Sequence, residues 1–514
     1  MSILQKSLPK RFFARQVRTI NEIINGEQRS PNPFKLSQDL KDKFVEYEKK
    51  YSLKEQNTNF IEEVHDFEIS LQDECENPKF NLLSANFNEP LQGYCTPEGS
   101  ERYFNRATST GKVHSDNFTH FKLKNEGEHL TLSKMAIGTQ TEHNGNLGDF
   151  YQYMCTKEAI RSGGVNFIDT ASHFRFQLSE RVIGQVLRTL TNKYGFNRDE
   201  LFISTKHGII SDDQLQNYPA DLVIEELKGQ QYNLNQEDIV QNIFCMHPRF
   251  LERQFQQSRE RMEIQTIDLA MLHAPFEQQS LISTTKSVKQ KMLLAFEFYE
   301  NKVQKGELKY YGLLADESVK MSAQEAEVYA KETNKSITRL MHDIYDTHKM
   351  VEDAFGKDHH FKFIQSILNV EQQYMLHLQN QNYGEGELQQ KLSLLDLCQE
   401  LGMGVIGYGV NLVNMRISAK DGPYDKVARQ YQIMKSINHP ALISCALGMD
   451  QLKYVESNLE CLSLPNADDE TRDKYLKPEE FKTMVQNEII SAEYINNNYD
   501  QLKKMKKNFH KQLK

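Results

Sequence analysis

The stretch FIDTASHFRFQLSERVIG, residues 167–184, combines an apolar strand, a loop and the start of a helix. Its strand ends in Asp169, and the ends of strands are where a parallel barrel carries its working residues. Five residues later, where we would look for a proton donor, the chain has Phe174, whose ring has no proton to give. The stretch therefore predicts a strand–helix unit that places a carboxylate at the mouth of a barrel. Whether a catalytic reaction takes place at that mouth stays open.

Similar units continue along the chain after residue 122, where apolar strand candidates alternate with amphipathic helix candidates. The helix candidates include residues 178–195, 250–262 and 293–306. Eight strands with following helices indicate an α/β fold, a closed (β/α)8 TIM barrel. A doubly wound open sheet is the alternative, but no GxGxxG motif follows the first strand. The predicted strands are residues 134–139, 165–171, 201–206, 266–273, 308–315, 361–368, 403–410 and 441–447.

The segments outside these units indicate additions to the barrel. Residues 207–242 and 317–356 are too long for minimal connections, and the second is helical in pattern. We interpret these inserts and the ends of the chain as surfaces for other protein subunits. The predicted organisation is a targeting segment at 1–25, an N-terminal extension at 26–121, the barrel at 122–462 and a C-terminal helical tail at 463–514.

The composition indicates a globular protein and argues against nucleic-acid-binding and membrane-spanning classes. Of the 514 residues, 39% are hydrophobic and 26% are charged, as in an ordinary globular protein. The net charge of -9 argues against a nucleic-acid partner, and no apolar run is long enough for a transmembrane segment. The seven cysteines are scattered and never form CxxC, which favours free thiols in a reducing compartment. Cys245 and His247 lack further ligands, so we interpret them as packing residues and predict no metal site.

The N-terminus has the composition of a mitochondrial targeting segment. Lys6, Lys10, Arg11, Arg15 and Arg18 are mixed with apolar residues, and no acidic residue precedes position 22. A disordered basic tail is the alternative. The prediction is a mitochondrial protein, in the matrix or facing it.

Polar residues stand at or near the ends of several predicted strands. Asp169, Lys206 and His273 come from the second, third and fourth strands, and Gln365 from the sixth. Because the ends of neighbouring parallel strands meet at one mouth, we expect an ion pair there with shifted pKa values. Each residue alone has a structural explanation, and only their convergence favours a functional site.

With these residues in place, the sequence resembles the aldo/keto reductase superfamily. The segments GGVNFIDTASHF, SERVIG, LFISTKHG and TIDLAMLH carry the resemblance, which extends from about Leu132 to Leu462. Further segments resemble a longer branch of the family: GYCTPEGSERYFNR, HHFKFIQSILN and ALGMDQLKYVESNL.

The resemblance implies reduction of carbonyls with NADPH by an Asp, Tyr, Lys and His set. Asp169, Lys206 and His273 match three of these, and Phe174 replaces the tyrosine that acts as general acid. A positioned general acid contributes roughly 10²–10⁴-fold to a rate, so catalysis is expected to be impaired. His173 is adjacent, but neighbouring residues that leave a strand point to opposite sides, so we do not expect it to substitute.

The resemblance also implies a site for NADP(H), and this chain departs from it. Gln365 matches the position that binds the carboxamide, Tyr408 is expected to stack on the nicotinamide, and Asn458 remains of the adenine-binding set. Leu314 and Ala315 replace a Ser-Asn pair, and Asp450 stands where a cation would meet the 2′-phosphate. A carboxylate there repels phosphate, so weak NADP(H) binding is expected.

Three functions stay open at this point. The first is a catalytically impaired accessory or structural subunit of a larger mitochondrial assembly. The second is an active NAD(P)H-dependent oxidoreductase that reduces an aldehyde or ketone. The third is a module that binds nicotinamide nucleotide without turnover.

Overall fold

A computed structural model describes seven parts of the chain, residues 89–122, 129–140, 145–235, 237–320, 342–410, 426–449 and 458–476. The targeting segment, Asp450 and the tail from residue 477 lie outside these described residues.

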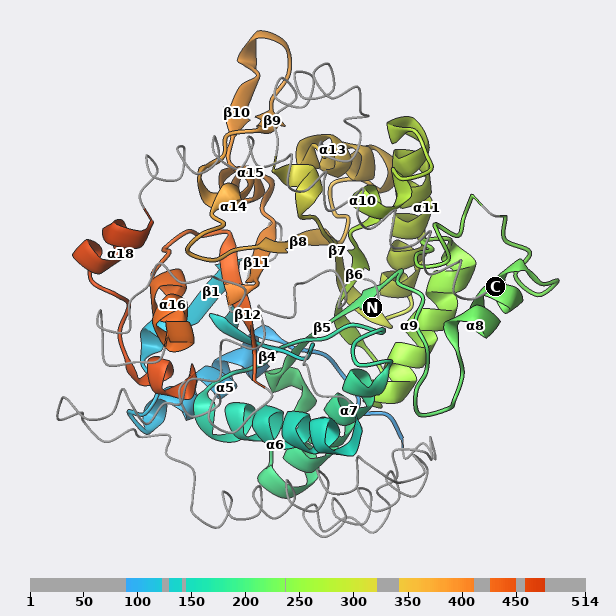
Figure 1. Ribbon diagram of the computed structural model, residues 1–514. Coiled ribbons are helices and arrows are strands. Elements are labelled where there is room, and N and C mark those ends of the chain that lie inside the picture. Colours follow the sequence, from blue (N-terminus) through green and yellow to red (C-terminus); the bar gives the residue numbers. More distant parts are fainter. Residues whose placement is uncertain are drawn as a thin grey trace.

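A closed barrel of eight parallel strands forms the centre of the molecule (Figure 1). The order β11-β12-β3-β4-β5-β6-β7-β8 follows the chain around the barrel, as in a (β/α)8 fold. Each predicted strand corresponds to one strand of this barrel, so the predicted TIM-barrel fold is confirmed. The strands are β3 (Met135–Gly138), β4 (Phe167–Asp169), β5 (Phe202–His207), β6 (Ile267–His273), β7 (Leu308–Leu314), β8 (Phe361–Ile367), β11 (Gly404–Tyr408) and β12 (Leu442–Gly448).

Helices surround the barrel on its outside (Figure 1). The predicted helices at 178–195, 250–262 and 293–306 correspond to α7, α9 and α11. Gly184 of α7 lies so close to α9 that a Cβ there would be 2.5 Å from the carbonyl oxygen of Arg261. The outer helices are α6 (Gly145–Gly163), α7 (Leu178–Tyr194), α9 (Pro248–Met262), α11 (Thr285–Gln304), α13 (Ile344–Phe355), α15 (Leu394–Leu401) and α16 (Lys426–Lys435).

Shorter elements decorate the connections between these units. The insert after β5 carries α8 and has a small apolar core of its own, which includes Cys245. The strands β9 and β10 form an antiparallel hairpin between β8 and β11. These elements are α8 (Ala220–Lys228), α10 (Pro275–Gln279), α14 (Tyr374–His377), α18 (Asp469–Tyr475), β9 (Gln381–Tyr383) and β10 (Gln390–Leu392).

A hairpin of β1 (Phe118–Lys122) and β2 (His129–Ser133) packs against the start of the barrel strands, after helix α5 (Pro97–Ser109). Phe121 packs against Phe363 inside the barrel, with ring centroids 5.8 Å apart. The hairpin contains residues on both sides of position 122, so the end of the extension and the start of the predicted barrel segment form one element. It fills the end of the barrel opposite the strand termini that carry Asp169 and His273.

Candidate functional site

A buried ion pair lies at the mouth of the barrel, between neighbouring strands. Lys206 Nζ is 2.8 Å from both Asp169 Oδ1 and Oδ2, and it also donates to the carbonyl oxygen of Thr170 at 2.9 Å. These three bonds use every N–H that an ammonium group has. The side chains are only 2% and 6% exposed. Burial lowers the pKa of Lys206, and the carboxylate of Asp169 opposes this shift only in part.

Phe174 stands next to this pair in the turn that follows β4. Its side chain is 5% exposed, and Lys206 Nζ lies 5.1 Å from the centroid of its ring. This contact is a cation–π interaction, which attracts the ammonium but transfers no proton. The mouth therefore presents a phenyl face to the lysine.

The turn after Phe174 has a backbone that L-residues rarely adopt. Arg175, Phe176 and Gln177 have φ angles of 50°, 55° and 71°, which are left-handed. A left-handed residue that is not glycine costs roughly 1–2 kcal/mol, so other contacts must hold the turn. The guanidinium of Arg175, fully buried, donates to Asp149 at 2.5 Å and to Gln152 at 2.5 Å on helix α6.

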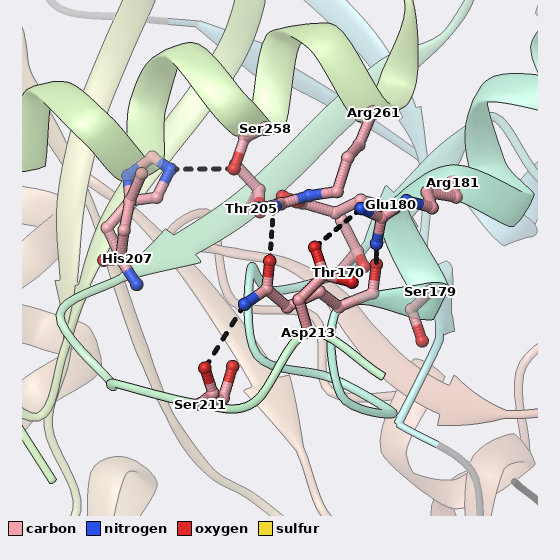
Figure 2. A network of polar contacts seen from close by, with 12 residues as sticks. Thr170, Ser179, Glu180, Arg181, Thr205, His207, Ser211, Asp213, Ser258 and Arg261 are labelled. Carbon is pink, nitrogen blue, oxygen red and sulfur yellow. Dashed lines mark hydrogen bonds and ion pairs between the residues drawn. The ribbon is translucent and has the colours of Figure 1, made fainter. Parts of the chain in front are cut away.

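A second set of contacts fixes the start of helix α7, immediately after the turn (Figure 2). Glu180 accepts from Thr205 Oγ1 at 2.6 Å and from Arg261 Nε at 2.7 Å. Arg261 also donates to Gln177 Oε1 at 2.6 Å, which joins α9 to the left-handed turn. In Figure 2 the side chains of Thr205, Glu180 and Arg261 converge between β5, α7 and α9. Sequence reasoning used the segment SERVIG only as a family motif and missed this positioning role.

His173 differs from its expected orientation. Its ring centroid is 4.9 Å from that of Phe174 and 4.8 Å from that of His273. The expectation that His173 points away from Phe174 is therefore wrong. Both residues lie in a turn, in which the N–H of Phe174 donates to the carbonyl oxygen of Ala171 at 3.1 Å, so the alternation of a strand does not apply to them. Burial, reinforced by nearby His273 and Lys206, lowers the pKa of His173 well below its usual value. Burial and the charge of Lys206 lower the pKa of His273 to about 3.

Gln365 completes the group at the mouth. Its Nε2 donates to Asp169 Oδ2 at 3.1 Å, while its buried Oε1 has no partner among the described residues. Tyr408, at the end of β11, donates its hydroxyl to the carboxylate of Asp316. Asp316 also accepts from the backbone N–H of Ile367 at 3.0 Å, so the phenol is tied to the loop after β7.

Asn458 lies beyond β12, in a part of the chain that follows the undescribed residues 450–457. It is 1% exposed, and neither Oδ1 nor Nδ2 has a partner among the described residues. A buried polar group without a partner costs about 1–3 kcal/mol. The orphaned atoms of Gln365 and Asn458 fit a bound polar ligand, as a nucleotide would require.

The remaining candidates do not add to this site. Cys245 is buried in the apolar core of the insert, and His247 caps helix α9 by accepting from the N–H of Arg249 at 3.2 Å. Within the described ranges, no three His, Cys, Asp or Glu side chains are grouped to hold a metal ion. A cavity of about 190 Å³ lies between the insert and α9, away from Lys206, and its lining side chains Arg253 and Glu226 are bonded to each other.

Comparison with known proteins gives a family match for part of the chain. The aldo/keto reductase family model matches residues 134–353. The matched segment of the barrel belongs to this family. The matched segment contains Asp169, Phe174, Lys206 and His273, so the phenyl ring lies inside the reductase core of the family.

The barrel of this chain is only distantly similar to the proteins and solved structures that it matches. A NADH-specific methylglyoxal reductase of Escherichia coli (strain K12) is 28% identical over 149 residues, 28% of this chain and 39% of that protein. The chain thus spans less than half the length of this relative. Two solved structures are each 14% identical: an aldo-keto reductase from Bacillus halodurans in its holo form, and one from Klebsiella pneumoniae in complex with NADP and acetate. Their TM-scores are 0.40 and 0.41, over 72% and 70% of this chain and 96% of each of theirs.

Among the described helices, none combines the length and apolar character that a membrane crossing needs.

Proposed function

We propose that this protein is an aldo/keto reductase barrel in which carbonyl reduction is strongly impaired. The observation that carries this proposal is the phenyl ring of Phe174, whose centroid is 5.1 Å from Lys206 Nζ. Hydride transfer to a carbonyl leaves negative charge on oxygen, which needs a matched proton. Phe174 has no proton, and the N–H donors of Lys206 are all bonded to Asp169 and Thr170.

The same barrel retains groups that fit a nicotinamide nucleotide. Gln365 would hold the carboxamide through its unpaired oxygen, and Asn458 would hold the adenine through its two unpaired atoms. Tyr408, held by Asp316, would pack beside the nicotinamide ring. When bound, NADP(H) supplies the hydride. Asp450 opposes a 2′-phosphate by its charge, which supports weak binding.

A second candidate is a slow NAD(P)H-dependent oxidoreductase that acts on an aldehyde or ketone. The intact Asp169–Lys206 pair and the position of His173 beside His273 favour it. In this candidate the protein accelerates the reaction by orientation and hydride supply, while water provides the proton.

The cellular role that we propose is that of an accessory subunit in a mitochondrial assembly. The basic, acid-free start of the chain and the long segments added to the barrel support it. Size fractionation of mitochondrial extracts tests this role. The protein is expected to elute at an apparent mass far above the 59.9 kDa of one chain. A peak at the mass of the monomer would contradict the proposal.

The impairment is tested by measuring NADPH binding and aldehyde-dependent NADPH oxidation in the purified full-length protein. Phe174→Tyr restores a phenol beside Lys206 and is expected to raise turnover by roughly 10²–10⁴-fold over the wild type. Phe176→Tyr, two residues away in the same turn, is the matched control and should leave turnover unchanged. Wild-type turnover equal to that of Phe174→Tyr, with both proteins binding NADPH, would refute the impairment.

A further inference from the structure

The two histidines at the barrel mouth form a close pair. The rings of His173 and His273 are 4.8 Å apart between centroids, with an interplanar angle of 80°. Nδ1 of each ring is buried and has no partner among the described residues. Because Nδ1 is enclosed in both rings, Nε2 is the nitrogen that a ligand at the mouth can reach.

Lys206 and Phe174, which also lie at the mouth, offer no free hydrogen-bond donor to a ligand oxygen. The ammonium of Lys206 is saturated by Asp169 and Thr170, and Phe174 offers only its ring. An oxygen bound beside Phe174 therefore finds its donors on the imidazoles. His173 lies against Phe174, with centroids 4.9 Å apart, so it stands close to where a phenol at position 174 would act.

We propose that His173 and His273 form a two-imidazole site that binds the oxygen of an uncharged carbonyl or hydroxyl ligand. His173 supplies one N–H donor in place of the absent phenol, and His273 supplies the second. The site shares the mouth with the impaired reductase proposed above, but it concerns binding and requires no proton transfer.

The charges around the pair select an uncharged ligand. His173 faces His273 on β6, Lys206 on β5 and, through Lys206, the carboxylate of Asp169 on β4. Burial keeps both imidazoles neutral at pH 7, and Asp169 balances Lys206. A neutral imidazole can polarise a carbonyl through an N–H bond. A carboxylate ligand would meet no uncompensated positive charge, and its burial would be unfavourable.

The test uses [carbonyl-¹³C]acetophenone as the probe and the full-length protein without nucleotide. Infrared difference spectroscopy is expected to show the carbonyl stretch of the bound ketone at lower frequency than in apolar solvent. In His173→Phe the shift should diminish and the affinity fall roughly 3–10-fold, the loss of one uncharged hydrogen bond. His173→Gln, which keeps an N–H donor, should recover most of the shift. Benzoate should compete poorly.

The matched control is His439→Phe, a half-buried ring before β12 that contacts Asp396. This variant should bind acetophenone as the wild type does. A wild type that binds no ketone, or a His173→Phe protein with wild-type frequency and affinity, would overturn the inference. His173→Gln covers the case in which His173→Phe does not fold. Because no NADPH is present, failure here would leave the Phe174→Tyr result standing.

Discussion

Removal of one partner of the buried pair between Asp169 and Lys206 is expected to destabilise the fold far more than removal of both. Lys206→Met leaves the carboxylate of Asp169, 6% exposed, with Gln365 as its remaining side-chain donor in the structure. Asp169→Leu leaves the ammonium with the single carbonyl of Thr170. Breaking a buried ion pair in this way costs about 3–5 kcal/mol of unfolding free energy.

The double variant Asp169→Leu/Lys206→Met should lie within about 1 kcal/mol of the wild type, because it leaves no buried charge. The direction of the pKa shift of Lys206 supports this, since its charged form is disfavoured in the folded protein even with Asp169 present. The contact with Asp169 therefore does not fully compensate for the burial of the Lys206 ammonium.

The assay is urea denaturation followed by circular dichroism, with free energies compared at equal slopes. Lys435→Met is a useful control, because this buried lysine donates to Asn117 Oδ1 and two backbone carbonyls and forms no ion pair with a carboxylate of the described residues. Its removal leaves no buried anion and should cost about 1–3 kcal/mol. Single variants that each lose less than 1 kcal/mol, or a double variant that loses their sum, would refute the reasoning. The second outcome would show that the two side chains contribute independently to the free energy of unfolding.

Two further predictions concern Asn458 and His207. Asn458→Leu removes two buried, unpartnered polar atoms, so it should stabilise the nucleotide-free protein by about 1–3 kcal/mol and weaken NADPH binding. Thermal unfolding with and without NADPH measures both effects. A loss of stability in the nucleotide-free protein would contradict the prediction. Burial lowers the pKa of His207 to about 4, so between pH 6.5 and 4 the unfolded chain binds a proton that the folded protein does not, and stability falls as the pH falls. This one group should account for about 1.6 kcal/mol between pH 6.5 and 5. Urea unfolding of His207→Gln should show a correspondingly weaker pH dependence, and identical slopes would argue against the shift.

The sequence alone determined the barrel and the location of its mouth. The eight apolar stretches and their helices alternate locally, so their type and order follow from short-range pattern. Asp169 and His273 are the last residues of β4 and β6, and Lys206 lies one residue before the end of β5. Parallel strands bring these ends together in any closed barrel, so the convergence needed no knowledge of side-chain packing. The substitution at Phe174 is likewise visible from its position in the motif.

Only the tertiary structure decided how the side chains at the mouth of the barrel are oriented. His173 and Phe174 lie in a turn that ends in three consecutive left-handed residues, Arg175, Phe176 and Gln177, which no propensity predicts in the absence of glycine. Contacts far along the chain stabilise that turn: Arg175 bonds to Asp149 on α6, and Gln177 to Arg261 on α9. Because such long-range contacts offset the local backbone preference, the facing pair of imidazoles could not be read from the sequence.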